Sequence, residues 1–190
     1  MSAQEFKQND LNRQSDTIDR LAADSFGHEN ISPVVDNAVS QDSVIGFIKE
    51  NNEIVTSGFG KEDTYKSDYK YKTMYLHTFS TKQEFRGRGL CSRLINEFVK
   101  KYGKTHVLYL TVRTEQFNVN ESAIHCYEKN GFILLPEVYR NHTDGKNNAM
   151  IRFPIKTQHK KQTKERKKGK LNDKIYFENN FQFLNYYNNI

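Results

Sequence analysis

The stretch Phe85-Arg86-Gly87-Arg88-Gly89-Leu90-Cys91 decides the fold that this sequence predicts. Before it, residues 74–80 alternate in the manner of a β-strand, and after it apolar residues recur at helical spacing from Leu90 to Val99. Two glycines between a strand and a helix let the backbone approach a ligand closely, and the helix start offers unpaired N–H groups with positive partial charge. The stretch is therefore a candidate phosphate site, and a plain strand-to-helix turn is the alternative.

This turn does not form either of two other phosphate motifs. The pattern G-x-x-x-x-G-K-[ST] does not occur in the chain, and G-x-G-x-x-G fails because Ser92 stands in the position of the third glycine. Arg86 and Arg88 nevertheless add formal positive charge. A different kind of phosphate-binding turn has to explain the stretch.

The flanking elements predict an α/β or α+β domain with a mixed sheet, because strand–helix–strand units imply right-handed crossovers and some parallel pairing. Alternation places Tyr75, His77 and Phe79 on one face of the strand over 74–80, and positions 74, 76 and 78 on the other. The other expected elements are a helix over 17–26 capped by Asp16, a β-hairpin over 43–59 around Glu50-Asn51-Asn52, a loop over 60–72, a helix closed by Gly103, a strand over 107–112, a helix over 121–129 capped by Asn120 and stopped by Asn130-Gly131, and strands over 132–135 and 149–153.

The 190 residues provide one domain and an extension. Residues 1–15 are polar and expected to be flexible, residues 16–155 form the expected domain, and residues 156–190 are a basic tail with an aromatic end. The tail holds nine Lys/Arg and three Asp/Glu, a difference equal to the net charge of +6 of the whole chain. The charge therefore says little about the partners of the domain itself.

Within the tail, the basic run over 160–170 reads as a solvated segment, with a nuclear localisation signal or a nucleic-acid backbone contact as alternatives. The aromatic segment over 175–187 is expected to dock on the domain or on a second copy in a homodimer. No apolar run approaches the roughly 20 residues of a membrane span, and the N-terminus has no signal-peptide core. We therefore expect a cytoplasmic protein without membrane partners.

Cysteine and histidine spacing predicts neither a metal site nor a disulfide framework. Cys91 and Cys126 do not form a C-x-x-C pair, and the histidines other than His77 show no ligand spacing. No histidine is placed by sequence to activate either thiol. A covalent intermediate on cysteine is therefore not favoured.

The glycine turn resembles motif A of the GCN5-related N-acetyltransferase (GNAT) family, (Gln/Arg)-x-x-Gly-x-(Gly/Ala). Here it reads Arg86-Gly87-Arg88-Gly89-Leu90-Cys91, with Cys91 where the family usually has Gly or Ala. Residues 120–132, NESAIHCYEKNGF, resemble motif B of the family, N-x-x-A-x-x-x-Y-x-x-x-G-F. Both motifs occur in the family's order, and the resemblance covers roughly residues 16–154.

The resemblance implies a mixed, mostly antiparallel sheet with a parallel, splayed central strand pair flanked by helices. It implies an enzyme that uses acetyl-CoA as cosubstrate and acetylates a primary amine directly. Backbone amides of the turn would hold the pyrophosphate, while the end of the strand over 74–80 and Asn120 would contact the pantetheine. The cofactor-binding residues implied in this way are Phe79, Ser80, Thr81, Arg86, Gly87, Arg88, Gly89, Leu90, Cys91, Asn120 and Tyr127.

The chemistry needs a base, an oxyanion site and an acid. An alkylammonium with a pKa of about 10 must lose a proton before attack, backbone N–H groups can stabilise the oxyanion, and the leaving thiolate benefits from a proton donor. Tyr127 matches the family tyrosine near the cofactor sulfur, with a packing role as the alternative. His77 is the candidate base, with a structural role, Tyr75, Glu84 or water as alternatives.

The acceptor is open between a small amine, a protein N-terminus and a lysine side chain. In the family, the helix over 17–26 and the loop over 139–146 would flank it, and carboxylates there could attract a cation. Two alternatives stay open: a non-catalytic CoA-binding module that binds nucleic acid or protein through the tail, and an assembly protein built through the aromatic segment. The carboxylates are Asp16, Asp19, Asp24, Glu62 and Asp63.

Overall fold

The computed structural model describes residues 4–5, 8–26, 34–40, 42–62, 72–115, 118–134 and 147–154. These residues form an eight-stranded sheet in the order β1-β2-β3-β4-β5-β8-β7, with β6 paired to β5. The elements are β1 (Gln4–Glu5), α1 (Gln8–Phe26), α2 (Val34–Ser40), β2 (Val44–Glu50), β3 (Glu53–Glu62), β4 (Lys72–Thr81), a 3₁₀ turn η1 (Gln83–Phe85), α3 (Leu90–Tyr102), β5 (His106–Glu115), β6 (Asn118–Val119), α4 (Glu121–Lys129), β7 (Ile133–Leu134) and β8 (Asn147–Arg152).

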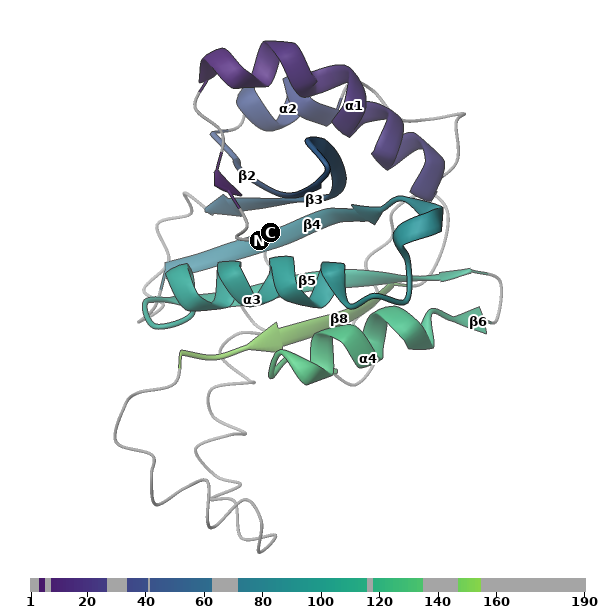
Figure 1. The fold of residues 1–190 in the computed structure, drawn as a ribbon. Coiled ribbons are helices and arrows are strands. Elements are labelled where there is room, and N and C mark those ends of the chain that lie inside the picture. Colours follow the sequence, from purple (N-terminus) through teal and green to yellow (C-terminus); the bar gives the residue numbers. More distant parts are fainter. Residues whose placement is uncertain are drawn as a thin grey trace, which may run out of the picture.

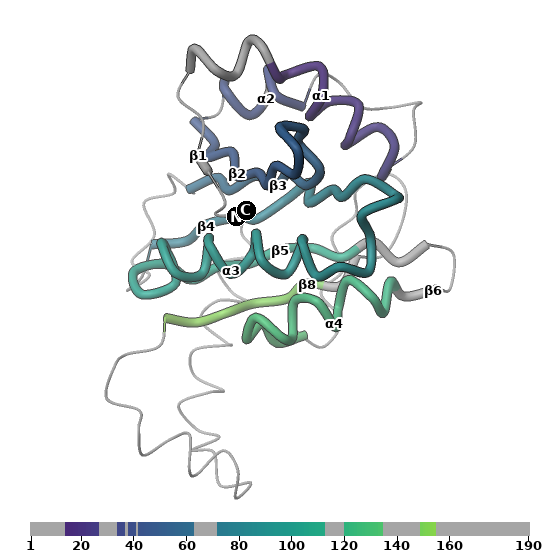
Figure 2. Tube along the Cα trace, viewed as in Figure 1, coloured from purple at the N-terminus to yellow at the C-terminus, as the bar shows by residue number. Residues whose placement is uncertain are grey.

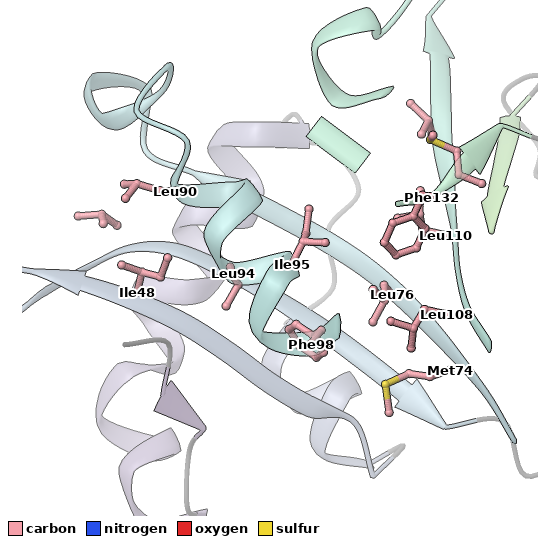
Figure 3. Close-up of a cluster of buried hydrophobic side chains, with 13 residues drawn as sticks. Ile48, Met74, Leu76, Leu90, Leu94, Ile95, Phe98, Leu108, Leu110 and Phe132 are labelled. Atoms are coloured by element: carbon pink, nitrogen blue, oxygen red, sulfur yellow. The ribbon is translucent and has the colours of Figure 1, made fainter. Parts of the chain in front are cut away.

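Helices cover both faces of this sheet (Figure 1). α3 and α4 lie side by side on one face, and α1 and α2 pack on the other. The larger core joins α3 to the strands through Leu94, Ile95 and Phe98 (Figure 3), and the smaller core joins Ile18 and Leu21 of α1 to the opposite face. The expected mixed α/β class is confirmed. The sheet is the middle one of three layers (Figure 1), and β4 and β5 lie in the middle of the sheet.

The β2–β3 hairpin agrees with the sequence expectation. Asn51 and Asn52 join the strands with φ of 50° and 65°, the left-handed backbone that a tight hairpin turn needs and that Asn tolerates. The expected loop over 60–72 is wrong at both ends, because β3 continues to Glu62 and β4 begins at Lys72. Backbone pairing between these two strands extends them into a region whose charged composition suggested a loop.

α1 begins at Gln8, so the predicted start with Asp16 as N-cap is wrong. Leu11 is the one apolar residue among residues 8–15, and the helical pattern therefore becomes visible only from Ile18 onward. α2 has no counterpart among the expected elements. Its N-terminus is completed from α1, where Asp19 Oδ1 accepts hydrogen bonds from the backbone N–H groups of Val34 at 2.8 Å and Val35 at 3.1 Å.

The central strands β4 and β5 are parallel and separate along their length. Their pairing runs from Lys72 with His106 to Tyr75 with Tyr109. Beyond that point β4 stays paired with β3, and β5 stays paired with β8. In the described residues no further pair joins β4 to β5, which confirms the splayed parallel pair.

A β-bulge in β4 moves Phe79 to the opposite face from the one predicted. Thr78 has a φ of 51°, and the register with β3 shifts between Ser57 and Phe59. The extra residue turns Phe79 toward α3, where its ring lies 5.7 Å from that of Phe98 in an edge-to-face contact. Strict alternation fails here because a bulge adds one residue on one strand only.

The remaining expected elements are present with small changes. α3 is closed by Gly103, α4 is capped by Asn120, and Gly131 follows α4 with a φ of 82°. β5 is longer than expected at both ends, and β8 begins earlier. The loop over 139–146 and the tail over 156–190 lie outside the described residues. No helix in the described ranges combines the length and apolarity that crossing a membrane requires.

Candidate cofactor-binding and active site

The turn before α3 is open to a ligand. Gly87 and Gly89 adopt φ values of 75° and 73°, a conformation that favours glycine, and a Cβ built on either would meet no atom within 4 Å. Gly89 is the N-cap of α3 and has no side chain to bond the first N–H groups. The side chain of Leu90 is buried in the larger core, so this residue can offer a ligand only its backbone. The turn has the features of an anion site.

The two arginines of the turn are held by the protein in different ways. Arg86 Nε donates to the carbonyl of Thr81 at 3.0 Å, which ties the turn to the end of β4. Arg88 pairs with Glu50 of the β2–β3 hairpin at 3.0 Å, and its guanidinium lies 4.9 Å from the Phe85 ring centroid. Sequence reasoning assigned both charges to the ligand, but Glu50 offsets part of the charge of Arg88.

The end of β4 lies beside this turn, past its last pair with β5. Ser80 and Thr81 pair with Ser57 and Thr56 of β3 on one side. On the side facing β5, the ladder has already ended at Tyr75 in the described residues. Backbone groups of this strand end are therefore left for another partner, as the resemblance implied for Phe79, Ser80 and Thr81.

α4 carries two of the candidate residues on one short helix. Asn120 Oδ1 accepts a hydrogen bond from the N–H of Ala123 at 3.0 Å, so its predicted capping role is confirmed. Tyr127 packs edge to face against Phe132, with ring centroids 6.1 Å apart. Tyr127 follows Asn120 by seven positions, which is about two helical turns, so both side chains share one side of α4.

The environment of Tyr127 keeps its hydroxyl protonated. Burial raises the pKa of Tyr127 well above the usual range of a phenol, and negative charge on Cys91, Cys126 or Tyr75 would raise it further. A neutral phenol at this position can donate a proton but cannot serve as a base near neutral pH. Packing and acid roles are therefore compatible in one residue.

His77 lies on the other face of the sheet, within a column of rings. It stacks on Phe59 and on Tyr75, with ring centroids 5.4 Å apart in each pair, and Tyr75 in turn lies 5.1 Å from Tyr109. Its Nδ1 is 3.0 Å from the hydroxyl of Thr78, the bulge residue. Burial, and then the charge of Lys61, lower the pKa of His77 to about 4, so the imidazole is neutral at physiological pH.

Tyr75 stands where the two central strands part. It is the last β4 residue paired with β5, and its hydroxyl lies 2.9 Å from that of Thr111. Tyr127 belongs to the α3–α4 side, and the His77 column belongs to the α1–α2 side. Candidate acid and base thus flank the strand opening from opposite faces.

Several candidate carboxylates serve the fold. Asp19 caps α2. Glu62 pairs with Lys72 at 2.7 Å and with His106 at 3.3 Å, and the hydrogen bond from Lys72 lowers the pKa of Glu62. Glu84 is exposed on η1. Asp16 and Asp24 are exposed on α1, and Asp63 lies outside the described residues.

Sequence reasoning missed two features of the site. Gly58, opposite the bulge, leaves room for the Phe79 ring, because a Cβ on Gly58 would lie 2.5 Å from that ring. Thr111 holds the hydroxyl of Tyr75. Neither residue carries a motif signal, since both matter only through contacts across strands. Among the described residues, no group of three or more His, Cys, Asp or Glu is arranged to hold a metal ion.

Residues 4–132 match the family described as the acetyltransferase (GNAT) family. The match covers more than half of the chain, and the protein belongs to this family. The resemblance carried by the two motifs is thereby confirmed.

Solved structures share the fold. A histone acetyltransferase HPA2 and related acetyltransferase from Corynebacterium glutamicum has a TM-score of 0.61 and 17% identity, over 83% of this chain and 98% of that chain. The aminoglycoside 6'-N-acetyltransferase from Enterococcus faecium has a TM-score of 0.62 and 16% identity, over 82% and 98%. A chain of the NatC complex bound to Gag peptide and CoA has a TM-score of 0.62 and 18% identity, over 82% and 100%. No curated protein matches the chain in sequence.

Proposed function

We propose that the protein is an acetyl-CoA-dependent N-acetyltransferase that transfers the acetyl group directly to a primary amine. The observation that carries this proposal is the uncapped N-terminus of α3 behind the open Gly87–Gly89 turn, next to the strand opening and Tyr127. Membership of the GNAT family supports the same reaction. The division into an acetyltransferase domain over 16–155 and a C-terminal extension stays a prediction.

The residues present fit acetyl-CoA as cosubstrate. Backbone N–H groups of residues 86–91 would hold the pyrophosphate, because the space in front of both glycines is empty of protein atoms. Phe79, Ser80 and Thr81 would offer backbone groups to the pantetheine, and Asn120 would contact it from α4. An N–H group of the β4 end would stabilise the oxyanion that forms when the amine attacks the thioester.

Tyr127 is proposed as the acid that protonates the leaving thiolate. Its raised pKa keeps the phenol protonated near neutral pH, so a proton is present to be donated to the leaving thiolate as the C–S bond breaks. His77 is proposed as the base, with its Nδ1 fixed by Thr78. With a pKa of about 4, its imidazole is available to accept a proton but accepts it weakly, so water and Tyr75 remain alternatives.

The first test is thermal unfolding with and without acetyl-CoA, with ATP and NAD as controls. A ligand at 100 times its Kd adds about 2.7 kcal/mol of stability, which raises the midpoint by several degrees. We expect a shift with acetyl-CoA and none with NAD. A folded protein that acetyl-CoA does not stabilise would contradict the proposal and favour a structural or nucleic-acid role.

Variants of two tyrosines in the same core distinguish a catalytic role from a packing role. Tyr127→Phe should lower kcat by about 10²- to 10⁴-fold at unchanged acetyl-CoA affinity. Tyr102→Phe is the matched control, since Tyr102 packs on the same cluster at the far end of α3. Equal kcat values in both variants would remove the acid role of Tyr127. A wild-type protein that binds acetyl-CoA but shows no turnover would instead favour the CoA-binding module.

A pH profile tests the base. If His77 accepts the proton, the acidic limb of kcat/KM lies near its pKa of about 4. An acidic limb at about 6.5, the value of an ordinary histidine, would assign the role elsewhere. His77→Gln should lower kcat, whereas the control His125→Gln, on the exposed side of α4, should not.

The acceptor class remains open between small amines, protein N-termini and lysines. Structures of similar fold are named for aminoglycoside, histone and ribosomal-protein-alanine acetylation. An aminoglycoside, a peptide with a free N-terminus and a lysine peptide with a blocked N-terminus are therefore the first acceptors to test. Release of free CoA thiol with one of them would assign the class.

A further inference from the structure

The only two cysteines of the chain lie on neighbouring helices, α3 and α4, which contact each other. Cys91 lies in the first turn of α3 and Cys126 lies in α4, and their thiols share a hydrogen bond. Both side chains are half-buried at the edge of the larger core. The proposed acetyl transfer uses neither thiol. Their proximity was not visible in the sequence, where the two cysteines have no motif spacing.

The contact between the two helices at this point is built by several groups. Asn130 Nδ2 donates to the hydroxyl of Ser92 at 2.8 Å and to the carbonyl of Cys126 at 2.9 Å. The side chain of Ser92 is also hydrogen-bonded to the Cys126 thiol. The cysteines therefore face each other across a helix contact that backbone and side-chain hydrogen bonds hold in place.

We propose that Cys91 and Cys126 form a redox-active dithiol, which a hydroperoxide oxidises to a disulfide that weakens cofactor binding at the α3 turn. The first half of the proposal concerns the thiols alone, and the second half rests on the proposed function. The disulfide can have only one intramolecular connectivity, because the chain contains no third cysteine.

The oxidation balances in two steps. The Cys126 thiolate attacks the peroxide oxygen and becomes a sulfenic acid, and the O–O bond breaks to release an alcohol or, from hydrogen peroxide, water. The Cys91 thiol then attacks the sulfenic sulfur, which forms the S–S bond and releases water. A dithiol reductant reverses the bond by thiol–disulfide exchange.

The surroundings of the two thiols indicate which of them reacts with the peroxide first. The hydrogen bond from Cys91, then that from Ser92 and the charge of Lys129, lower the pKa of Cys126 against its partial burial. The same contact, together with burial, raises the pKa of Cys91. Cys126 is thus the thiol that ionises first and reacts first, because the thiolate is the nucleophile.

The position of the pair links its oxidation to the site. Cys91 directly follows the Gly87–Gly89 turn, and Cys126 directly precedes Tyr127. An S–S bond of about 2.05 Å requires the sulfur atoms to come closer than in a thiol–thiol hydrogen bond. Closing it draws the first turn of α3 and the centre of α4 together, so the amides proposed for the pyrophosphate and the Tyr127 side chain shift at once.

The test treats the full-length reduced protein with hydrogen peroxide and removes the excess. Intact mass should fall by about 2 Da, both thiols should become unreactive to a thiol reagent, and the chain should stay monomeric on a non-reducing gel. The affinity for acetyl-CoA should fall about tenfold or more, which corresponds to a smaller thermal shift, and dithiothreitol should restore it.

Cys126→Ser is the control, because a hydroxyl can keep the hydrogen bonds to Cys91 and Ser92 but cannot form a disulfide. Peroxide should leave its acetyl-CoA affinity unchanged. Cys126→Ala serves the same purpose if the serine variant does not fold. A wild-type protein that keeps both thiols, or that forms disulfide-linked dimers, would overturn the dithiol.

Disulfide formation and acetyl-CoA affinity, measured separately, distinguish failure of this proposal from failure of the proposed function. Disulfide formation without a change in acetyl-CoA affinity would overturn the regulatory half of the proposal. Reduced protein that acetyl-CoA fails to stabilise would contradict the proposed function, while mass and thiol reactivity would still decide whether the dithiol forms.

Discussion

α3 and α4 lie next to each other on one face of the sheet (Figure 2), yet their N-termini are capped differently. α4 begins at Asn120, whose side chain bonds the N–H of Ala123. α2, on the opposite face, has its first N–H groups bonded by Asp19. α3 begins at Gly89, which offers no side chain at all.

The difference shows where the protein leaves room for a ligand. An uncapped helix start forgoes about 1 kcal/mol of stability that a capping side chain would contribute. In return, its N–H groups and positive partial charge stay available to an anion. The C-terminal ends of the two helices resemble each other, because Arg152 donates to the carbonyl of Gly103 after α3 at 3.3 Å and to that of Asn130 after α4 at 3.1 Å.

The largest effect should come from placing an acid at the uncapped helix. Gly89→Asp puts a carboxylate where the pyrophosphate would bind, and we expect loss of acetyl-CoA binding in a folded protein. Gly89→Asn is the matched control, because Asn tolerates the left-handed backbone equally and carries no charge. Isothermal titration with acetyl-CoA measures the difference. Equal affinity in the two variants would mean that the anion binds elsewhere.

The next largest effect should come from Arg152, whose guanidinium donates to a carbonyl at the C-terminal end of α3 and to one at the C-terminal end of α4. Arg152→Met should lower the free energy of unfolding by roughly 2–3 kcal/mol, because two helix carbonyls lose a charged donor. Urea unfolding measures this change, and Lys104→Met, on an exposed neighbour of Gly103, should have almost none. An Arg152→Met variant with an unchanged free energy of unfolding would show that solvent replaces the guanidinium at both helix ends.

A smaller loss is expected at α2. Asp19→Ala removes the acceptor for two N–H groups and should cost about 1–2 kcal/mol of stability. Asp19→Asn keeps a side-chain oxygen and should recover most of it. Neither variant should change acetyl-CoA affinity, because this cap lies on the opposite face from α3. A change in affinity at constant stability would instead give Asp19 a role in the site.

The smallest effect should be found at α4. Asn120→Ala should cost about 1 kcal/mol of stability, and Asn120→Ser, which keeps a capping oxygen, should cost less. Acetyl-CoA titration of the serine variant then isolates the proposed pantetheine contact. Lower affinity in a variant with normal stability supports that contact, and unchanged affinity leaves Asn120 with capping alone.

Local sequence signals predicted the parts of the site that depend on backbone conformation. Gly87, Gly89 and Gly131 adopt positive φ values, and Asn120 caps α4 as expected. Signals failed where the deciding contact was distant. The bulge at Thr78 reversed the face of Phe79, which alternation alone could not reveal.

The sequence by itself determined the order of the strands and helices apart from β1, α2 and β6, together with the glycine turn, the cap of α4 and the family, because each depends on residues close together in the chain. Tertiary structure alone decided that Asp19 completes α2, that Glu50 pairs with Arg88, that the ring column around His77 lowers its pKa, and that Cys91 meets Cys126. Burial and pairing between distant segments set these features, and neither is encoded in any short stretch of sequence.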